Sequence, residues 1–262
     1  MVLLGFFLAL FVGISLGLIG GGGSILAMPI LVYIFHFTPQ LSTSYSLFIV
    51  GVSALIGSAK HYKQHNLKLK TTLIFGMPSI VSLLLVRKFI LPKIPTVVFT
   101  INRFIITKDI LLMIIFAILM IVASISMIKQ SKANVQANET NNLKLVLVGF
   151  CVGIITGFLG AGGGFLIIPA LIFFANLSMK QAIGTSLSII AINAIIGFLG
   201  DLVNHVQLNF QFLLMFTTIA IVGIFPGTFL SKKVDGNKLK PAFGWFVLIA
   251  GTYIIVKEFM SF

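Results

Sequence analysis

Long apolar stretches separated by short polar connections make up most of this chain. Eight stretches lie at about residues 2–35, 43–59, 71–91, 110–128, 145–175, 181–199, 210–230 and 242–256. Their length suits helices that cross a hydrocarbon core, and they lack the alternation of apolar and polar residues that marks the strands of a membrane barrel. The pattern therefore predicts an all-α polytopic membrane protein.

The first and fifth stretches are too long for one upright helix. The first runs for 34 uncharged residues from Val2 to Phe35, and a straight helix of that length would measure about 50 Å against a core of about 30 Å. Each stretch contains a glycine cluster, at residues 20–23 and 160–164, and each glycine weakens a helix by about 1 kcal/mol relative to alanine. We predict a break at both clusters. A strongly tilted helix, a discontinuous helix and a hairpin that returns to the same face all fit this pattern.

The two clusters belong to an internal duplication. At a shift of 140 residues, the window 12–31 matches the window 152–171 at ten of twenty positions, where chance in this composition gives about two. We expect a first membrane repeat over residues 1–128, a polar linker over 129–142 and a second repeat over 143–262, joined in one transmembrane domain. Each repeat has four segments and begins with a glycine-broken or re-entrant helix.

Composition and charge support a membrane protein. The chain is 58% hydrophobic and 9% charged, with a mean hydropathy of +1.15, which excludes an ordinary soluble protein. Its net charge of +13 would suggest nucleic acid binding in a soluble protein. Here the basic residues cluster in the connections 60–70, 87–108, 129–144 and 232–240, so we expect lipid headgroup contacts and no nucleic acid partner. If the glycine stretches turn back, the first, third and fourth clusters share one face and the halves are inverted repeats.

The glycine breaks are the best candidates for a binding site. Irregular backbone at membrane depth is tolerated only inside protein or beside a water-filled cavity, and the freed amides at a helix N-terminus suit an anion. Hydroxyl residues that begin the next helix of each repeat, and one buried amide, add uncharged donors. We predict these substrate-binding residues: Gly20, Gly22, Gly23, Ser24, Thr43, Ser44, Gly160, Gly162, Gly163, Gly164, Thr185, Ser186 and Asn193. Close helix packing through glycine and local helix capping by hydroxyls are the alternative interpretations.

Other chemistry finds little support in the sequence. Asp201 ends an apolar stretch and Glu258 lies near the C-terminus, so we expect no relay of intramembrane carboxylates. The chain lacks the clustered ligands of a metal site and the glycine patterns of nucleotide-binding enzymes. The single cysteine, Cys151, is expected to be a small core residue. We therefore expect no enzyme, no cofactor and no metal.

Several motifs together form a recognisable pattern: Gly17 to Gly23 with Pro29, Gly157 to Gly164 with Pro169, Gly184-Thr185-Ser186, Gly227-Thr228 through Lys240, Phe243-Gly244 and Gly251. This pattern resembles the TauE/SafE family, the sulfite exporter family of membrane permeases. The similarity covers nearly the whole chain. The third helix of the first half, from Gly76-Met77-Pro78 to Arg87-Lys88, and the link after it depart from the family pattern, so no site residue is carried over from there.

The resemblance implies a multi-pass protein of the inner cell membrane that moves sulfite, sulfoacetate or a related organosulfur anion. We expect export of a small oxyanion, with membrane lipids as neighbours; a homo-oligomer is compatible with the sequence. Uptake, transport of another solute and a scaffold that transports nothing are the alternatives. Amides from both glycine breaks converging on a polar cavity would favour transport, and dry glycine contacts would favour a scaffold.

Overall fold

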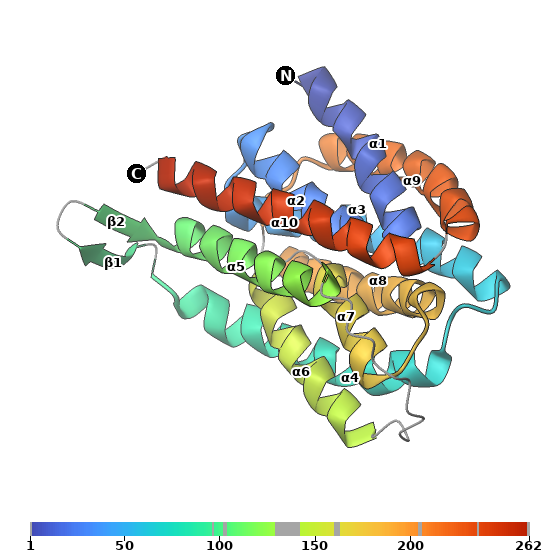
Figure 1. Cartoon of the computed structure of the whole chain (residues 1–262). Helices are drawn as coiled ribbons and strands as arrows, with labels where there is room; N and C mark the ends of the chain where they lie inside the picture. The colour runs from blue at the N-terminus through green and yellow to red at the C-terminus, as the bar shows by residue number, and fades with distance from the viewer. Residues whose placement is uncertain are drawn as a thin grey trace.

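The computed structural model describes residues 2–95, 97–101, 104–128, 142–159, 163–203, 206–234 and 236–260. Its helices are α1 (Val2–Ile19), α2 (Gly22–Tyr33), α3 (Pro39–Lys63), α4 (Leu69–Leu85), α5 (Lys108–Ile128), α6 (Asn142–Leu159), α7 (Gly164–Phe174), α8 (Met179–Val203), α9 (Phe210–Lys233) and α10 (Gly236–Met260). They form one helical bundle (Figure 1). The predicted all-α polytopic class is confirmed.

Helix length and composition make the chain a multi-pass membrane protein. Six helices of the described chain are long and apolar enough to cross a membrane: α3, α4 with its extension to Lys93, α5, α6, α8 and α9. The apolar helices α1, α2 and α7 are shorter. These short helices flank the two glycine clusters, as expected from stretches that break instead of crossing in one piece.

The first glycine cluster makes a hairpin. α1 ends at Ile19 and α2 begins at Gly22, with Gly20 at φ 79°, a conformation that glycine adopts without strain. A Cβ on Gly23 would lie 2.6 Å from the Val12 carbonyl oxygen, and the rings of Phe6 and Phe35 are 5.6 Å apart. α2 therefore runs back along α1, as the hairpin alternative requires. The break is shorter than predicted, because Gly22 and Gly23 already belong to α2.

The second cluster interrupts the chain between α6 and α7. α6 ends at Leu159 and α7 begins at Gly164, while residues 160–162 lie outside the described residues, as does most of the predicted linker. Gly163 precedes α7 in the left-handed region, at φ 66°. Both halves thus begin with two helices on either side of a glycine in this conformation.

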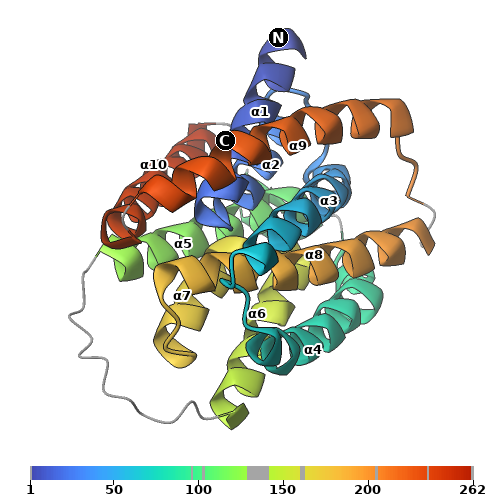
Figure 2. The ribbon, with the colours of Figure 1, turned by 90° about the vertical axis from the view of Figure 1, so that its right-hand side faces the viewer.

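Helices α3 and α8 cross in opposite directions at the centre of the bundle. A Cβ on Gly51 would lie 3.1 Å from the Ala194 side chain, and one on Gly197 would lie 3.3 Å from the Leu47 side chain. We call the place where the end of α8 meets the start of α3 the Asp201 end, and the opposite place the Lys60 end. Figure 2 views the bundle from the Lys60 end, with α3 and α8 beside each other near its middle.

The first helix of each half packs against a helix of the other half. α1 packs along α9 of the other half, where a Cβ on Gly13 would lie 2.8 Å from the Ala220 carbonyl carbon. In the same way α6 packs along α4, where a Cβ on Gly153 would lie 2.6 Å from the Cα of Ser79. α5 packs along α10. These close contacts need glycine because a side chain would meet the neighbouring backbone.

The link after α4 and the position of Cys151 differ from what the sequence predicted. The link after α4 contains a π-turn (Val86–Ile90), a 3₁₀ turn (Leu91–Lys93) and an antiparallel pair of strands, β1 (Val97–Ile101) and β2 (Phe104–Thr107), which the hydropathy pattern did not predict. Their valine, isoleucine, threonine and phenylalanine content favours strands. Cys151 is exposed on α6, so the prediction that it lies in the core was wrong. The sequence does not distinguish an apolar helix face directed at lipid from one directed at the core.

Candidate functional site

The two glycine breaks meet in the interior of the bundle. A Cβ on Gly164 would lie 2.6 Å from the Cα of Gly21 and 3.4 Å from the carbonyl oxygen of Gly20. Gly20 also lies beside α8, since its own Cβ would be 2.9 Å from Ser186 Oγ. Residues 20–24 and residues 163–164 are buried. The N-termini of α2 and α7 therefore pack directly against each other. This is the close glycine contact expected of a scaffold and not the convergence of amides on a polar cavity expected of a transporter.

The structure brings some predicted site residues to this meeting point and separates others. Gly20, Gly22, Gly23 and Ser24 lie there, with Gly163, Gly164 and Ser186. Gly160 and Gly162 lie outside the described residues. The Ser24 hydroxyl donates to the Gly21 carbonyl at 2.8 Å, and the Thr43 hydroxyl donates to the Gln40 carbonyl at 2.7 Å, so both are engaged in local bonds.

Ser44 and Thr185 lie at opposite ends of the α3/α8 pair. Ser44 donates to Asp201 at the Asp201 end, whereas Thr185 accepts a bond of 3.1 Å from the backbone N–H of Lys68 near the Lys60 end. The starts of the two helices, where the repeat aligns Thr43-Ser44 with Thr185-Ser186, lie at opposite ends because α3 and α8 run in opposite directions. The buried Asn193 lies between the ends and donates to Ser79 Oγ at 2.7 Å.

A buried ion pair marks the Asp201 end. Arg87 Nε donates to Asp201 Oδ1 at 2.9 Å, and Nη2 donates to Oδ2. Ser44 Oγ donates to the same Oδ2 at 2.6 Å. Arg87 and Asp201 are only 6% and 5% exposed. The geometry is the bidentate fork that makes arginine–carboxylate pairs strong.

This pair corrects two expectations from the sequence. Arg87 is not a headgroup-contacting loop residue, because the π-turn continues α4 and keeps its side chain inside the bundle. Asp201 is buried although it ends an apolar stretch, and Glu258 is buried too. The partners are 114 residues apart, so no local pattern joins them. Opposite charges at the ends of two apolar stretches were the one available signal.

The ion pair lines a cavity of about 260 Å³. Its lining residues are Gln40, Ser44, Arg87, Leu91, Pro92, Lys108, Asp201 and Val206. Lys108 is 9% exposed, and its Nζ donates to the Leu91 carbonyl at 2.6 Å; its expected place among lipid headgroups is therefore also wrong. The cavity lining itself carries two basic side chains and one carboxylate, and Asp109 follows Lys108 directly in the chain; the donors of Arg87 and Lys108 suit an anion.

A second cationic pocket lies at the Lys60 end. It measures about 440 Å³ and is lined by Lys60, Lys63, Gln64, Phe225, Thr228 and Phe229. Lys60 Nζ donates to Thr228 Oγ1 at 3.2 Å and lies 3.7 Å above the Phe225 ring. The two ends of the α3/α8 pair thus both present basic side chains to cavities.

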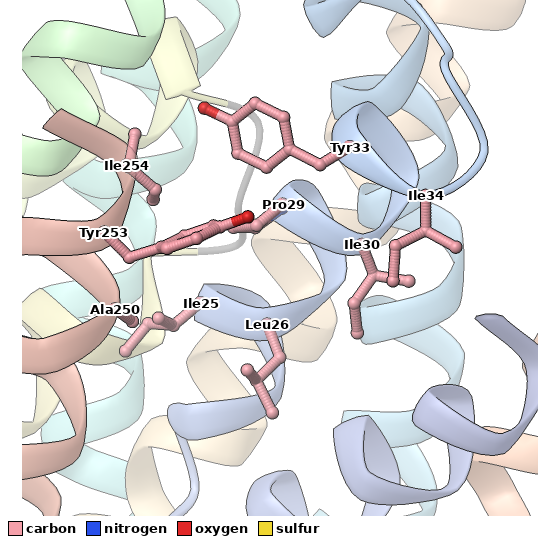
Figure 3. Close-up of a pocket in the computed structure, with 9 residues that line it drawn as sticks. All are labelled: Ile25, Leu26, Pro29, Ile30, Tyr33, Ile34, Ala250, Tyr253 and Ile254. Carbon is pink, nitrogen blue, oxygen red and sulfur yellow. The ribbon is translucent and has the colours of Figure 1, made fainter. Parts of the chain in front are cut away.

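An apolar groove between α2 and α10 has a different character (Figure 3). It measures about 200 Å³ and is lined by Ile25, Leu26, Pro29, Ile30, Tyr33, Ile34, Ala250, Tyr253 and Ile254. At its rim Tyr33 donates to Glu258 at 2.7 Å. This lining suits hydrocarbon better than an anion.

Comparison with known proteins decides the family. The family model described as "Sulfite exporter TauE/SafE" matches residues 5–254. The chain belongs to the sulfite exporter TauE/SafE family. A "Probable membrane transporter protein" of Xylella fastidiosa is 29% identical over 95% of this chain and 93% of its own length. A relative with that description from Methanocaldococcus jannaschii is 28% identical over 76% of this chain and 70% of its own length. Another from Bacillus subtilis, YjnA, is 24% identical over 95% and 97%. No solved structure matches.

Membership of the TauE/SafE family identifies the chain as a membrane transporter. It works among lipids, and its cargo is a small solute. Within the described residues, no group of three or more histidine, cysteine, aspartate or glutamate side chains is arranged to hold a metal ion.

Proposed function

We propose that this protein is a permease that exports sulfite or a related organosulfur oxyanion across the inner cell membrane. The observation that carries the proposal is the meeting of the α2 and α7 N-termini at Gly20, Gly21 and Gly164. Each N-terminus carries about half a positive charge from the aligned peptide dipoles and offers unpaired amide groups. Two such ends facing each other favour an anion between them.

The proposed path joins this meeting point to the cationic pockets at the two ends of α3/α8. Ser44 lies at one end of the α3/α8 pair, Thr185 at the other and Asn193 between them, so this path would pass three of the residues predicted to bind substrate. The glycine contact is closed in this conformation, because a single methyl group at Gly164 would clash with Gly21. Passage of an anion therefore requires the α1/α2 hairpin and α7 to separate. Relative movement of two repeats is the usual means of alternating access in transporters built this way.

Charge asymmetry supports an orientation for this path. Among the described side chains, those in loops and at helix ends on the side of the Lys60 end include Lys60, Lys63, Lys68, Lys70, Lys144, Lys180 and Lys233, whereas those on the side of the Asp201 end include Arg87, Lys88, Lys93, Lys108 and Lys257. Figure 1 shows the first side at the right, with the α3–α4 loop, and the second at the left, with the β1/β2 hairpin. The positive-inside tendency places the Lys60 end in the cytoplasm. An inside-negative potential then drives each negative charge toward the Asp201 end with about 2.3 kcal/mol per 100 mV.

Flux into proteoliposomes tests the proposal. The purified protein is reconstituted and offered sulfite, thiosulfate, sulfoacetate and chloride under an imposed potential. We expect movement of sulfite or another sulfur oxyanion well above that of chloride, in the direction set by the potential. Flux of none of these anions would reject the proposal and favour another small solute as the cargo.

The glycine contact has its own variant and control. Gly164→Val should abolish flux while membrane insertion is kept, because the added atoms would overlap Gly21 and Ile190. Gly76→Ala is the matched control, since its Cβ has no neighbour closer than Ile189 Cγ1 at 4.0 Å. Unchanged flux in Gly164→Val would remove this contact from the path.

A further inference from the structure

We propose that Arg87 and Lys108 form an oxyanion-binding site at the Asp201 end, and that Asp201 is a built-in competitor that holds Arg87 when no oxyanion is bound. The identity of the anion rests on the proposed function above. The site itself rests on the side chains that line the cavity.

Arg87 has donor capacity that the protein leaves unused. Its Nε and Nη2 atoms bind Asp201, but the buried Nη1 has no hydrogen-bond partner within the described part of the chain. A guanidinium carries five N–H donors, and an unmade hydrogen bond on a buried charged group is costly. Replacing a buried ion pair by apolar residues is often neutral or stabilising, so such a pair inside a membrane bundle indicates function more than stability.

Lys108 supplies a second buried cation to the same cavity. Its Nζ donates to the Leu91 carbonyl at 2.6 Å, and an ammonium group has three donors. Arg87 comes from the π-turn after α4, Lys108 from the start of α5 and Asp201 from the end of α8. Three separate elements therefore bring two cations and one carboxylate to a cavity of about 260 Å³.

This arrangement suits a small oxyanion that competes with a carboxylate. Sulfite is a pyramidal anion with several acceptor oxygens. Arginine can bind two oxygens of such an anion through two parallel hydrogen bonds. Because Asp201 occupies this fork, an entering oxyanion must displace it or share Arg87 through Nη1. When the oxyanion leaves, Asp201 returns to Arg87. Asp201 thereby lowers affinity and speeds release on the side where an exporter discharges its cargo.

Binding measurements in lipid nanodiscs test this site without requiring flux. Sulfite is titrated calorimetrically into the protein in phosphatidylcholine nanodiscs. Asp201→Asn should tighten sulfite binding about tenfold, since it removes the competing charge but keeps the side-chain shape. Arg87→Lys and Lys108→Gln should each weaken it about tenfold. Lys88→Gln is the matched control, because Lys88 is the next residue of the π-turn but is exposed. The Lys88→Gln variant should bind sulfite with the affinity of the wild type.

The double variant Arg87→Gln/Asp201→Asn guards against misfolding, since it leaves neither charge of the pair buried. It should stay folded and lose sulfite binding. Wild-type affinity in the double variant, or an unchanged or weakened affinity in a folded Asp201→Asn variant, would overturn the proposal. Repeating the titration in phosphatidylglycerol nanodiscs, whose headgroups carry a net negative charge, separates a site for a free oxyanion from a site for an anionic lipid headgroup. Loss of the sulfite heat there would show a headgroup site and also overturn it.

Failure of the site and failure of the proposed function are distinguishable. If the wild type moves no anion but the affinities shift as stated, the site stands and the export function falls. If the wild type moves sulfite but the variants bind as the wild type does, the function stands and the site falls.

Discussion

The two ends of the α3/α8 pair have similar backbones and different chemistry. At each end the last turns of one helix meet the start of the other. A shift of 140 residues takes His61 to Asp201, and a shift of 141 takes Arg87 to Thr228. The Asp201 end therefore has a buried cation and anion where the Lys60 end has a histidine and a threonine. If the two halves are the predicted duplication, corresponding positions carry different charges, and the two ends of the proposed path are therefore chemically unequal.

The largest expected effect is a loss of stability at the Asp201 end. Arg87→Gln leaves Asp201 buried without its cation and should cost about 3 to 5 kcal/mol of stability. Lys60→Gln at the opposite end should cost about 1 kcal/mol or less, because Lys60 is only partly buried and bonds a neutral hydroxyl. Thermal unfolding in detergent measures both. Equal losses would show that the two ends are equally dependent on their cations.

A smaller effect tests whether the exchanged helices are packed alike in both halves. Gly13→Ala and Gly153→Ala should each destabilise by about 1 to 3 kcal/mol, because the new Cβ meets backbone of α9 or α4. Gly76→Ala serves as the control and should cause no loss. The same unfolding assay applies, and a loss at one site alone would contradict equivalent packing.

The smallest expected effect concerns polar positions along α3 and α8. Asn193→Ala removes the bond to Ser79 and should cost about 1 to 2 kcal/mol. Ser53 is its counterpart at a shift of 140, and its buried Oγ has no partner in the described ranges. Ser53→Ala should therefore leave the unfolding temperature unchanged or raise it slightly. A loss equal to that of Asn193→Ala would show that Ser53 makes a hydrogen bond in the folded protein.

The helical class and the first glycine break were predictable because they depend on local properties. Hydropathy sets the helices, and the cost of glycine in a helix sets the break at Gly20. The hairpin form needed the structure, since it depends on packing between Phe6 and Phe35. Arg87 and Asp201 could not be paired from the sequence, because their contact joins the π-turn after α4 to the end of α8. The repeat made Ser44 and Thr185 look like one site, whereas inversion of α3 against α8 sends them to opposite ends.

The exchange of α1 and α6 between the halves has a consequence for how the protein is made. The glycine face of α1 has no partner until α9 has been synthesised. The first residues of the two helices are about 200 residues apart, which corresponds to roughly 10 to 40 s of synthesis. During that interval Gly13 and Gly17 face lipid or a helper of the insertion machinery. The first half therefore cannot reach its final fold before the second half has been inserted, and a chain truncated between the halves leaves α1 without its partner.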